Sequence, residues 1–220
     1  MKNIFKSSIG RKIAMALSGI FLIVFLTQHF LINITSVFSE DVFNMLSHFM
    51  GNNPLVQFVL QPVLIAGVLF HFVMGFVLEW QNRKARPVTY AMYKGSKNSM
   101  FVSRNMIISG IVILSFLVLH FYDFWVPEMD YKYIKSLPED PNRYYEELIH
   151  KVENPVRVGL YCLSFIFLAL HLVHGLSSST QSLGTNNKYA RTIEKISYAF
   201  GIVVPLGFCF IALYHFFIHF

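Results

Sequence analysis

Charged residues are scarce in this sequence: Asp, Glu, Lys and Arg make up 14% of its 220 residues, whereas 55% are hydrophobic. A soluble domain carries about 25% charged residues. The hydrophobic residues also lie in long unbroken runs, and a run of about 18 or more with few charges is typical of a membrane-spanning helix. The shortage of charge therefore argues against a soluble domain and predicts an integral membrane protein.

Cysteine is also scarce. Cys162 and Cys209 each stand alone in an apolar stretch, and we expect both to be buried thiols. The motif C-x-x-C-H is missing, so any haem would be bound non-covalently. The first apolar run is long enough to span a membrane and the A-x-A-like site at 14–16 precedes it, so a cleaved signal peptide is not expected.

The net charge of +6 does not predict a nucleic-acid partner. The basic residues lie in short segments between the apolar runs, where membrane topology and anionic lipid account for them. We therefore expect lipid, and no nucleic acid, to be the partner of these charges.

Five apolar runs predict an all-α bundle of five transmembrane helices that forms a single domain over 1–220. Each run has about 22–25 residues, which at about 1.5 Å per residue crosses a hydrocarbon core about 30 Å thick. Asn53-Pro54 and Asn154-Pro155 mark two helix starts, because Asn caps a helix and proline suits its first turn. The expected spans are about 13–36, 54–78, 105–126, 155–176 and 196–219.

The basic residues also indicate how the bundle is oriented. Lys and Arg gather in the segments 2–12, 83–104 and 188–195, which by the positive-inside rule face the cytoplasm. The segment 36–53 has no Lys or Arg, and the segment 127–154 is rich in acidic residues. We therefore expect the N-terminus in the cytoplasm and the C-terminus on the outer side, as in a multi-pass protein of the cytoplasmic membrane.

Histidine is abundant, and most histidines fall inside the predicted spans. An ionisable group inside a membrane is costly, so each one is a hypothesis of function, although histidine also forms ordinary hydrogen bonds between helices. Of the nine histidines, six lie inside the spans, and His219 stands at the very end of the last span. The six are His29, His71, His120, His171, His174 and His215.

The alternating direction of the spans sorts four of these histidines by depth. His29 and His120 lie on outward-running spans, at similar depths near the outer end, about 9 Å from it for His29. His71 and His171 lie on inward-running spans, about 8–12 Å from the inner end. The sequence therefore predicts an outer pair and an inner pair.

Two depth-matched pairs are what two b haems with two axial imidazoles each require. Zinc or copper normally needs three or four ligands at one point, which two separate pairs fit poorly. Gly67, Gly75 and Gly175 share a helix face with His71 or His171, where they would give a porphyrin clearance; close helix packing is the alternative explanation.

The other histidines receive lesser roles. His174 competes with His171 as a ligand, and we assign it a supporting role beside the inner haem. His215 and His219, four residues apart at the outer end of the last span, are expected to be interfacial anchors. His48 and His150 lie in outer segments and are expected to be solvated.

Several motifs resemble a known family. The residues 8–12 (SIGRK) and 15–19 (MALSG), then His29 followed by Asn33, resemble the opening of the dihaem cytochrome b anchor of succinate:quinone oxidoreductases. This is the succinate dehydrogenase and fumarate reductase family, in its five-helix, single-anchor form. The basic segment 83–90 and the spacing of His171 and Gly175 are similar to that family too, so the resemblance covers essentially the whole chain.

The resemblance implies a role in a respiratory complex. A flavoprotein subunit and an iron–sulfur subunit would dock on the cytoplasmic face and carry out the dicarboxylate chemistry. The chain would anchor them and carry electrons between the iron–sulfur subunit and membrane quinone. His71 and His171 would ligate the inner haem iron, and His29 and His120 the outer one.

A quinone site would need a proton-handling group at the membrane edge near a haem. Asp123, one turn beyond His120, is the first candidate by depth, and Glu40, Asp41 and Gln57 are weaker ones. No family motif matches these four residues, and ordinary interfacial polarity is the alternative explanation. The quinone type, the direction of the reaction, the haem potentials and the oligomeric state do not follow from the sequence.

Two other functions fit the same pattern. The cytochrome b anchor of a quinone-linked hydrogenase or formate dehydrogenase is also a dihaem bundle, but it has nickel or molybdenum partners. A transporter that uses histidines for protons or metal would show no haem absorbance band on reduction.

The segment 81–104 generates the first prediction, because its positive charge and its aromatic Tyr90 and Tyr93 suit a polar, charged interface. Reversing the charges of Arg83, Lys84 and Arg86 should release the soluble subunits, and more readily at high salt. Co-purification at two salt concentrations measures this. Unchanged assembly would contradict the assignment of this segment as the docking surface.

Overall fold

The computed structural model describes residues 7–84, 106–184 and 189–219, and these are almost entirely helical, with no β-strand among them. The predicted docking segment 81–104 therefore lies largely outside the described residues. Within the described part, five helical stretches are long and apolar enough to cross a membrane. They are Ser8–Thr35, Val56–Lys84, Met106–Ile134, Pro155–Ser182 and Ala190–His219. The all-α membrane bundle is confirmed, and the chain is a multi-pass membrane protein.

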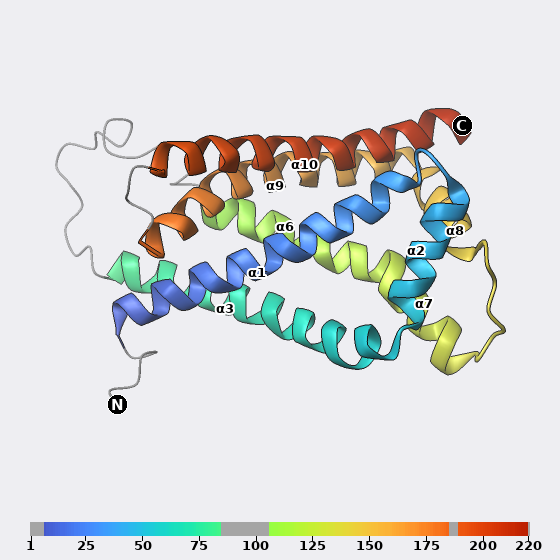
Figure 1. Cartoon of the computed structure of the whole chain (residues 1–220), viewed down its shortest axis with the longest axis horizontal. Helices are drawn as coiled ribbons and strands as arrows, with labels where there is room; N and C mark the ends of the chain where they lie inside the picture. The colour runs from blue at the N-terminus through green and yellow to red at the C-terminus, as the bar shows by residue number, and fades with distance from the viewer. Residues whose placement is uncertain (1–6, 85–105, 185–188, 220) are drawn as a thin grey trace.

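The long helices run back and forth along one axis (Figure 1). They are α1 (Ser8–Thr35), α3 (Gln61–Lys84), α6 (Met106–His120), α9 (Pro155–Ser182) and α10 (Ala190–His219). Helix α1 packs against α3, α9 and α10, while α9 packs against α1, α6 and α10. Helices α1 and α9 therefore form the centre of the bundle, and residues on both can meet partners from several helices.

The two expected helix starts are confirmed by their caps. The Asn154 side chain accepts hydrogen bonds from the backbone N–H groups of Val156 and Arg157, at 3.0 and 3.1 Å. The Asn53 side chain accepts them from Leu55 and Val56, at 2.9 and 3.4 Å. Each cap satisfies N–H groups that have no partner within the helix.

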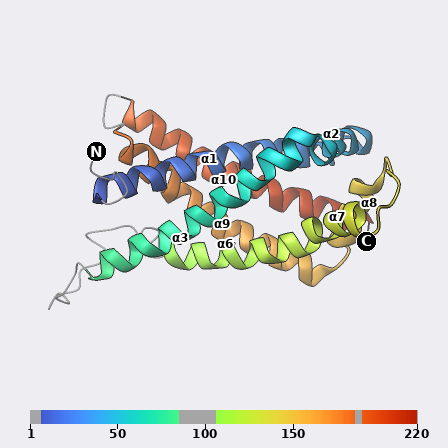
Figure 2. The same cartoon turned by 90° about the horizontal axis from the view of Figure 1, so that it is seen from below.

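Two short helices close one end of the bundle, where the sequence analysis expected only loops. Helix α2 (Glu40–Asn52) and helix α8 (Arg143–Val152) lie at the end that also holds the C-terminus (Figures 1 and 2). The signals for α2 are Ser39, which caps Val42 N–H at 3.3 Å, and two acidic residues in the first turn. In α8 the apolar residues recur at helical spacing, which gives it a buried face.

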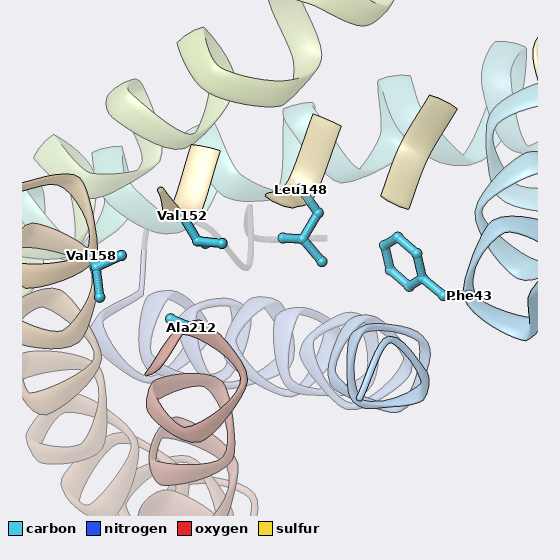
Figure 3. Packing of buried hydrophobic residues seen from close by; sticks show 5 residues of the cluster. All are labelled: Phe43, Leu148, Val152, Val158 and Ala212. Carbon is cyan, nitrogen blue, oxygen red and sulfur yellow. The ribbon is translucent and has the colours of Figure 1, made fainter. Parts of the chain in front are cut away.

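These short helices pack onto the long ones through a cluster of apolar side chains (Figure 3). Fully burying one such side chain contributes about 1.5–3 kcal/mol. The cluster therefore attaches α2 and α8 to the long helices. It joins α2, α8, α9 and α10 through Phe43, Leu148, Val152, Val158 and Ala212.

Many apolar side chains along the spans are exposed in the isolated chain. Val24 is 65% exposed, Val73 62% and Val203 60%. Continuous apolar surface of this extent does not suit water but suits lipid tails. Cys162 and Cys209, expected to be buried, are only half-buried, and the Cys209 thiol lies 3.7 Å from the Cys162 carbonyl between α9 and α10.

Two spans contain a π-helical turn just before a proline. The segment η2 (Val56–Leu60) ends two residues before Pro62, and η3 (Phe121–Trp125) ends two residues before Pro127. A proline ring inside a helix clashes with the carbonyl four residues earlier, and a wider turn relieves that clash. The third span therefore continues through α7 (Val126–Met129) and η4 (Asp130–Ile134), past its expected end at 126.

Close packing of α9 on α10 generates the second prediction. A Cβ atom added at Gly201 would lie 2.8 Å from the backbone nitrogen of Val173, which cannot move aside easily. We expect Gly201→Ala to lower the free energy of unfolding by about 1–3 kcal/mol. Gly159→Ala is the matched control, because a Cβ at Gly159 meets nothing within 4 Å. Equal stability of the two variants in detergent unfolding would contradict this packing.

Candidate functional site

The structure brings the inner histidines together. The rings of His71 on α3 and His171 on α9 have centroids 6.3 Å apart and an interplanar angle of 68°. His174 is half-buried and lies one turn further toward the inner end of α9. The fourth-span histidine that faces His71 is thus His171.

Each inner histidine has a serine beside its Nδ1 atom. Ser18 Oγ lies 3.0 Å from His71 Nδ1 and Ser109 Oγ lies 3.2 Å from His171 Nδ1. Both hydroxyls donate their single proton to a backbone carbonyl one turn earlier, at 2.8 and 2.9 Å. Each serine must therefore accept a hydrogen bond from Nδ1–H, which assigns the Nε2 atoms of both histidines as unprotonated lone-pair donors.

The outer histidines also meet. The rings of His29 on α1 and His120 on α6 have centroids 5.8 Å apart and are nearly perpendicular, at 82°. Aromatic rings surround this pair: Phe25 and Phe208 contact His29, and Phe116, Phe124 and Tyr161 contact His120.

The outer pair has no serine like those of the inner pair among the described residues. The Asn33 amide nitrogen donates to the His29 carbonyl at 2.8 Å and lies 3.4 Å from His29 Nδ1. The Nδ1 atom of His120 is buried and has no hydrogen-bond partner in the described part of the chain. A buried polar atom without a partner is costly, and binding a ligand there would remove that cost.

The spacing of both pairs fits two imidazoles that share one metal ion. A ligating nitrogen lies about 2 Å from its metal and the ring centre about 1 Å behind it, which places two opposed ring centres about 6 Å apart. Each pair supplies two nitrogen donors, and no cluster of three or more His, Cys, Asp or Glu residues occurs within the described ranges. Two axial nitrogens are the protein's share of a bis-histidine haem, whose porphyrin supplies the other four.

The glycines beside the inner pair differ from the expected set. A Cβ at Gly19 would lie 3.5 Å from His71 Cε1, and one at Gly110 would lie 4.0 Å from His171 Cε1. At Gly67 it would meet the Phe21 ring at 2.7 Å, so close packing of α1 on α3 accounts for that glycine. Gly75 and Gly175 instead face the methyl ends of Met15 and Met106.

Asp123, the first quinone-site candidate, is buried and has two partners on α9. It is 1% exposed, pairs with Arg157 on α9 at 2.8 Å and accepts a hydrogen bond from Tyr161 at 2.9 Å. The ring of Tyr161 in turn lies 6.4 Å from that of His120. This arrangement pairs Asp123 with Arg157 and links it through Tyr161 to the outer pair.

The weaker quinone-site candidates, Glu40, Asp41 and Gln57, lack the buried ion pair of Asp123 within the described part of the chain. Glu40 and Asp41 are exposed in the first turn of α2, where negative charge stabilises a helix. The Gln57 amide donates to the Gly51 carbonyl and accepts from Tyr133 at 3.3 Å. The structure thus gives these three residues capping and packing roles.

The structure corrects two expectations about outer histidines. His48 is not solvated: it is largely covered, its Nε2–H donates to the Pro141 carbonyl at 3.1 Å, and Nδ1 lies 3.1 Å from Glu139. His215 is not an interfacial anchor, because it is 0% exposed inside the bundle. His150 is exposed, as expected.

A network of charges at the outer end had no counterpart in the sequence analysis. Glu128 on α7 pairs with Arg143 on α8 and with Lys132 at 2.6 Å, and it accepts a hydrogen bond from Tyr144 at 2.9 Å. Burial, and then the charge of Glu128, raise the pKa of Tyr144. The spacing of Glu128 and Lys132 at i and i+4 is the one signal in the sequence for this network.

Comparison with known proteins finds no relative of this chain. No family model, no curated protein and no solved structure matches the chain. The histidine pairs and their neighbours are therefore the structural basis for a proposed function.

The ion pair of Asp123 generates the third prediction. Asp123→Asn leaves Arg157 without its partner, and we expect a loss of about 1–3 kcal/mol of stability. The loss falls below that of a fully buried pair because the Arg157 side chain is 29% exposed. Asp130→Asn is the matched control, since its ion pair with Lys135 lies at the surface. Equal unfolding temperatures of Asp123→Asn and Asp130→Asn would contradict a structural role for Asp123.

Proposed function

We propose that this chain is a dihaem cytochrome b, the membrane anchor of a succinate:quinone oxidoreductase. The observation that supports it most is the presence of two facing histidine pairs in one bundle, His71 with His171 and His29 with His120. Each haem, when bound, supplies a one-electron carrier.

The chain's own residues would hold and orient these carriers. His71 and His171 present unprotonated Nε2 atoms, while Ser18 and Ser109 fix the ring orientation by accepting from Nδ1–H. A partner on the second nitrogen orients a ligating histidine and raises its basicity. At the outer level, the aromatic rings around His29 and His120 exclude water and lower the local dielectric.

The resemblance in the first span favours this complex over other dihaem anchors. Ser18 and Gly19, which belong to the motif at 15–19, are the residues of α1 that border His71. The motif shared with the family therefore supports the inner site directly. The anchor of a hydrogenase or formate dehydrogenase remains the second candidate, and nickel or molybdenum in a co-purified partner would favour it.

The proposal includes a place for the chain in the cell and in the complex. It would lie in the cytoplasmic membrane, with an iron–sulfur subunit and a flavoprotein on the side of the N-terminus. Electrons would pass between those subunits and quinone by way of the inner and then the outer pair. The succinate or fumarate chemistry would remain on the partner subunit.

Alanine variants generate the fourth prediction. Replacing His71 or His171 removes an axial ligand, so the inner haem component should disappear from a redox titration followed by absorbance. Succinate oxidation with an artificial soluble acceptor should persist, while quinone reduction fails. Replacing His29 or His120 should spare the inner component and cut transfer to quinone.

His174→Ala is the matched control, one turn from His171 on the same helix. It should retain both haem components. Loss of a haem in this variant, with both haems kept in His171→Ala, would contradict the assignment of His171 as the ligand.

A further inference from the structure

A third polar pair lies beyond the outer histidines. His215 on α10 is 0% exposed, and its Nε2 atom lies 2.9 Å from Oγ of Ser36, the residue that follows α1. The Ser36 hydroxyl donates its proton to the Asn33 carbonyl at 2.7 Å. It must therefore accept from His215 Nε2–H, which leaves Nδ1 as the unprotonated nitrogen of this ring.

This Nδ1 atom is buried and lacks a hydrogen-bond partner within the described residues. A buried acceptor without a partner raises the free energy of the folded chain. A proton taken up at Nδ1 would use that lone pair and convert His215 into an imidazolium. His215 thus has the form of a base that is held in place and ready to accept one proton.

Two polar side chains lie between His215 and the end of the bundle that holds the C-terminus (Figure 1). The rings of Tyr145 on α8 and His219 on α10 lie 5.6 and 5.9 Å from that of His215. The Tyr145 hydroxyl lies 3.4 Å from His219 Nε2, and His219 is exposed. Burial and the charge of Glu40 on α2 raise the pKa of Tyr145, so its hydroxyl stays protonated and can pass a proton on.

His215 lies close enough to the outer pair for a charge at one to act on the other. Phe208 on α10 contacts the His29 ring, and His215 follows seven residues later, about 10 Å further along the helix. Through the low-dielectric interior, an electron arriving at the outer pair would attract a proton to His215. The titratable side chains that contact His215 within the described residues are Tyr145 from α8 and Tyr214 and His219 from α10, and Glu40 on α2 lies near Tyr145.

We propose that His215 is a proton-loading site for the outer haem, an inference that rests on the proposed dihaem function. With the outer haem bound, a proton from the outer aqueous phase would bind at His215 Nδ1 when that haem is reduced. The same proton would leave His215 when the haem is reoxidised. One N–H bond forms and breaks, and the added positive charge balances the electron.

A redox titration at several pH values tests this proposal. In the wild-type protein, the equilibrium constant for reducing the outer haem should change by up to tenfold per pH unit. For one electron this corresponds to a change of about 59 mV in the midpoint potential. That potential should rise as the pH falls. His215→Gln keeps an N–H donor for Ser36 but cannot take up a proton, so this dependence should shrink. His150→Gln, at an exposed histidine on the same side, should retain it.

A second measurement uses only the wild-type protein, so it applies even if His215→Gln does not fold or bind haem. The redox-induced infrared difference spectrum of wild-type protein with ring-¹⁵N histidine should contain bands of an imidazolium formed on reduction of the outer haem. Their absence would overturn the proposal, as would an unchanged pH dependence in His215→Gln. If the protein contains no haem, the proposed function fails instead, so the two failures are distinguishable.

Discussion

A histidine ring inside a membrane bundle has two nitrogens that water does not reach, and each needs a partner from the protein or from a ligand. In this chain a serine hydroxyl that already donates to the backbone can only accept, so it decides which ring nitrogen carries the proton. At His71 and His171 the serine accepts from Nδ1–H and leaves the Nε2 lone pair unused. At His215 it accepts from Nε2–H and leaves the Nδ1 lone pair unused. The same serine–histidine contact would thus suit the proposed metal binding at the first two rings and the proposed proton uptake at the third.

Helix α1 contributes a residue to each of these three sites along its length. It supplies Ser18 to the inner pair and His29 to the outer pair, and Ser36 at its end meets His215. The separations of 11 and 7 residues are close to three and two full helical turns, so all three side chains share one face. The central place of α1 between α3, α9 and α10 lets that face meet partners from different helices.

The sequence was sufficient for the bundle and for the grouping of His29 with His120 and His71 with His171, because hydropathy, direction and rise per residue determine depth. It was not sufficient for contacts that depend on rotation about each helix axis. The partners of Asp123 and the burial of His215 belong to this class. The helix beyond Pro127 was missed because a π-helical turn accommodates the proline. Helices α2 and α8 were missed because the Ser39 cap of α2 and the short apolar faces of both helices lie in segments interpreted only by charge.

The proposed function requires each histidine pair to hold one haem iron. Pyridine-haemochrome analysis of the purified chain, normalised to polypeptide by amino-acid analysis, tests this requirement most directly. Two haem b per chain are expected, both low-spin when the absorbance spectrum is recorded before pyridine is added. One haem, or none, per chain would contradict the proposed function.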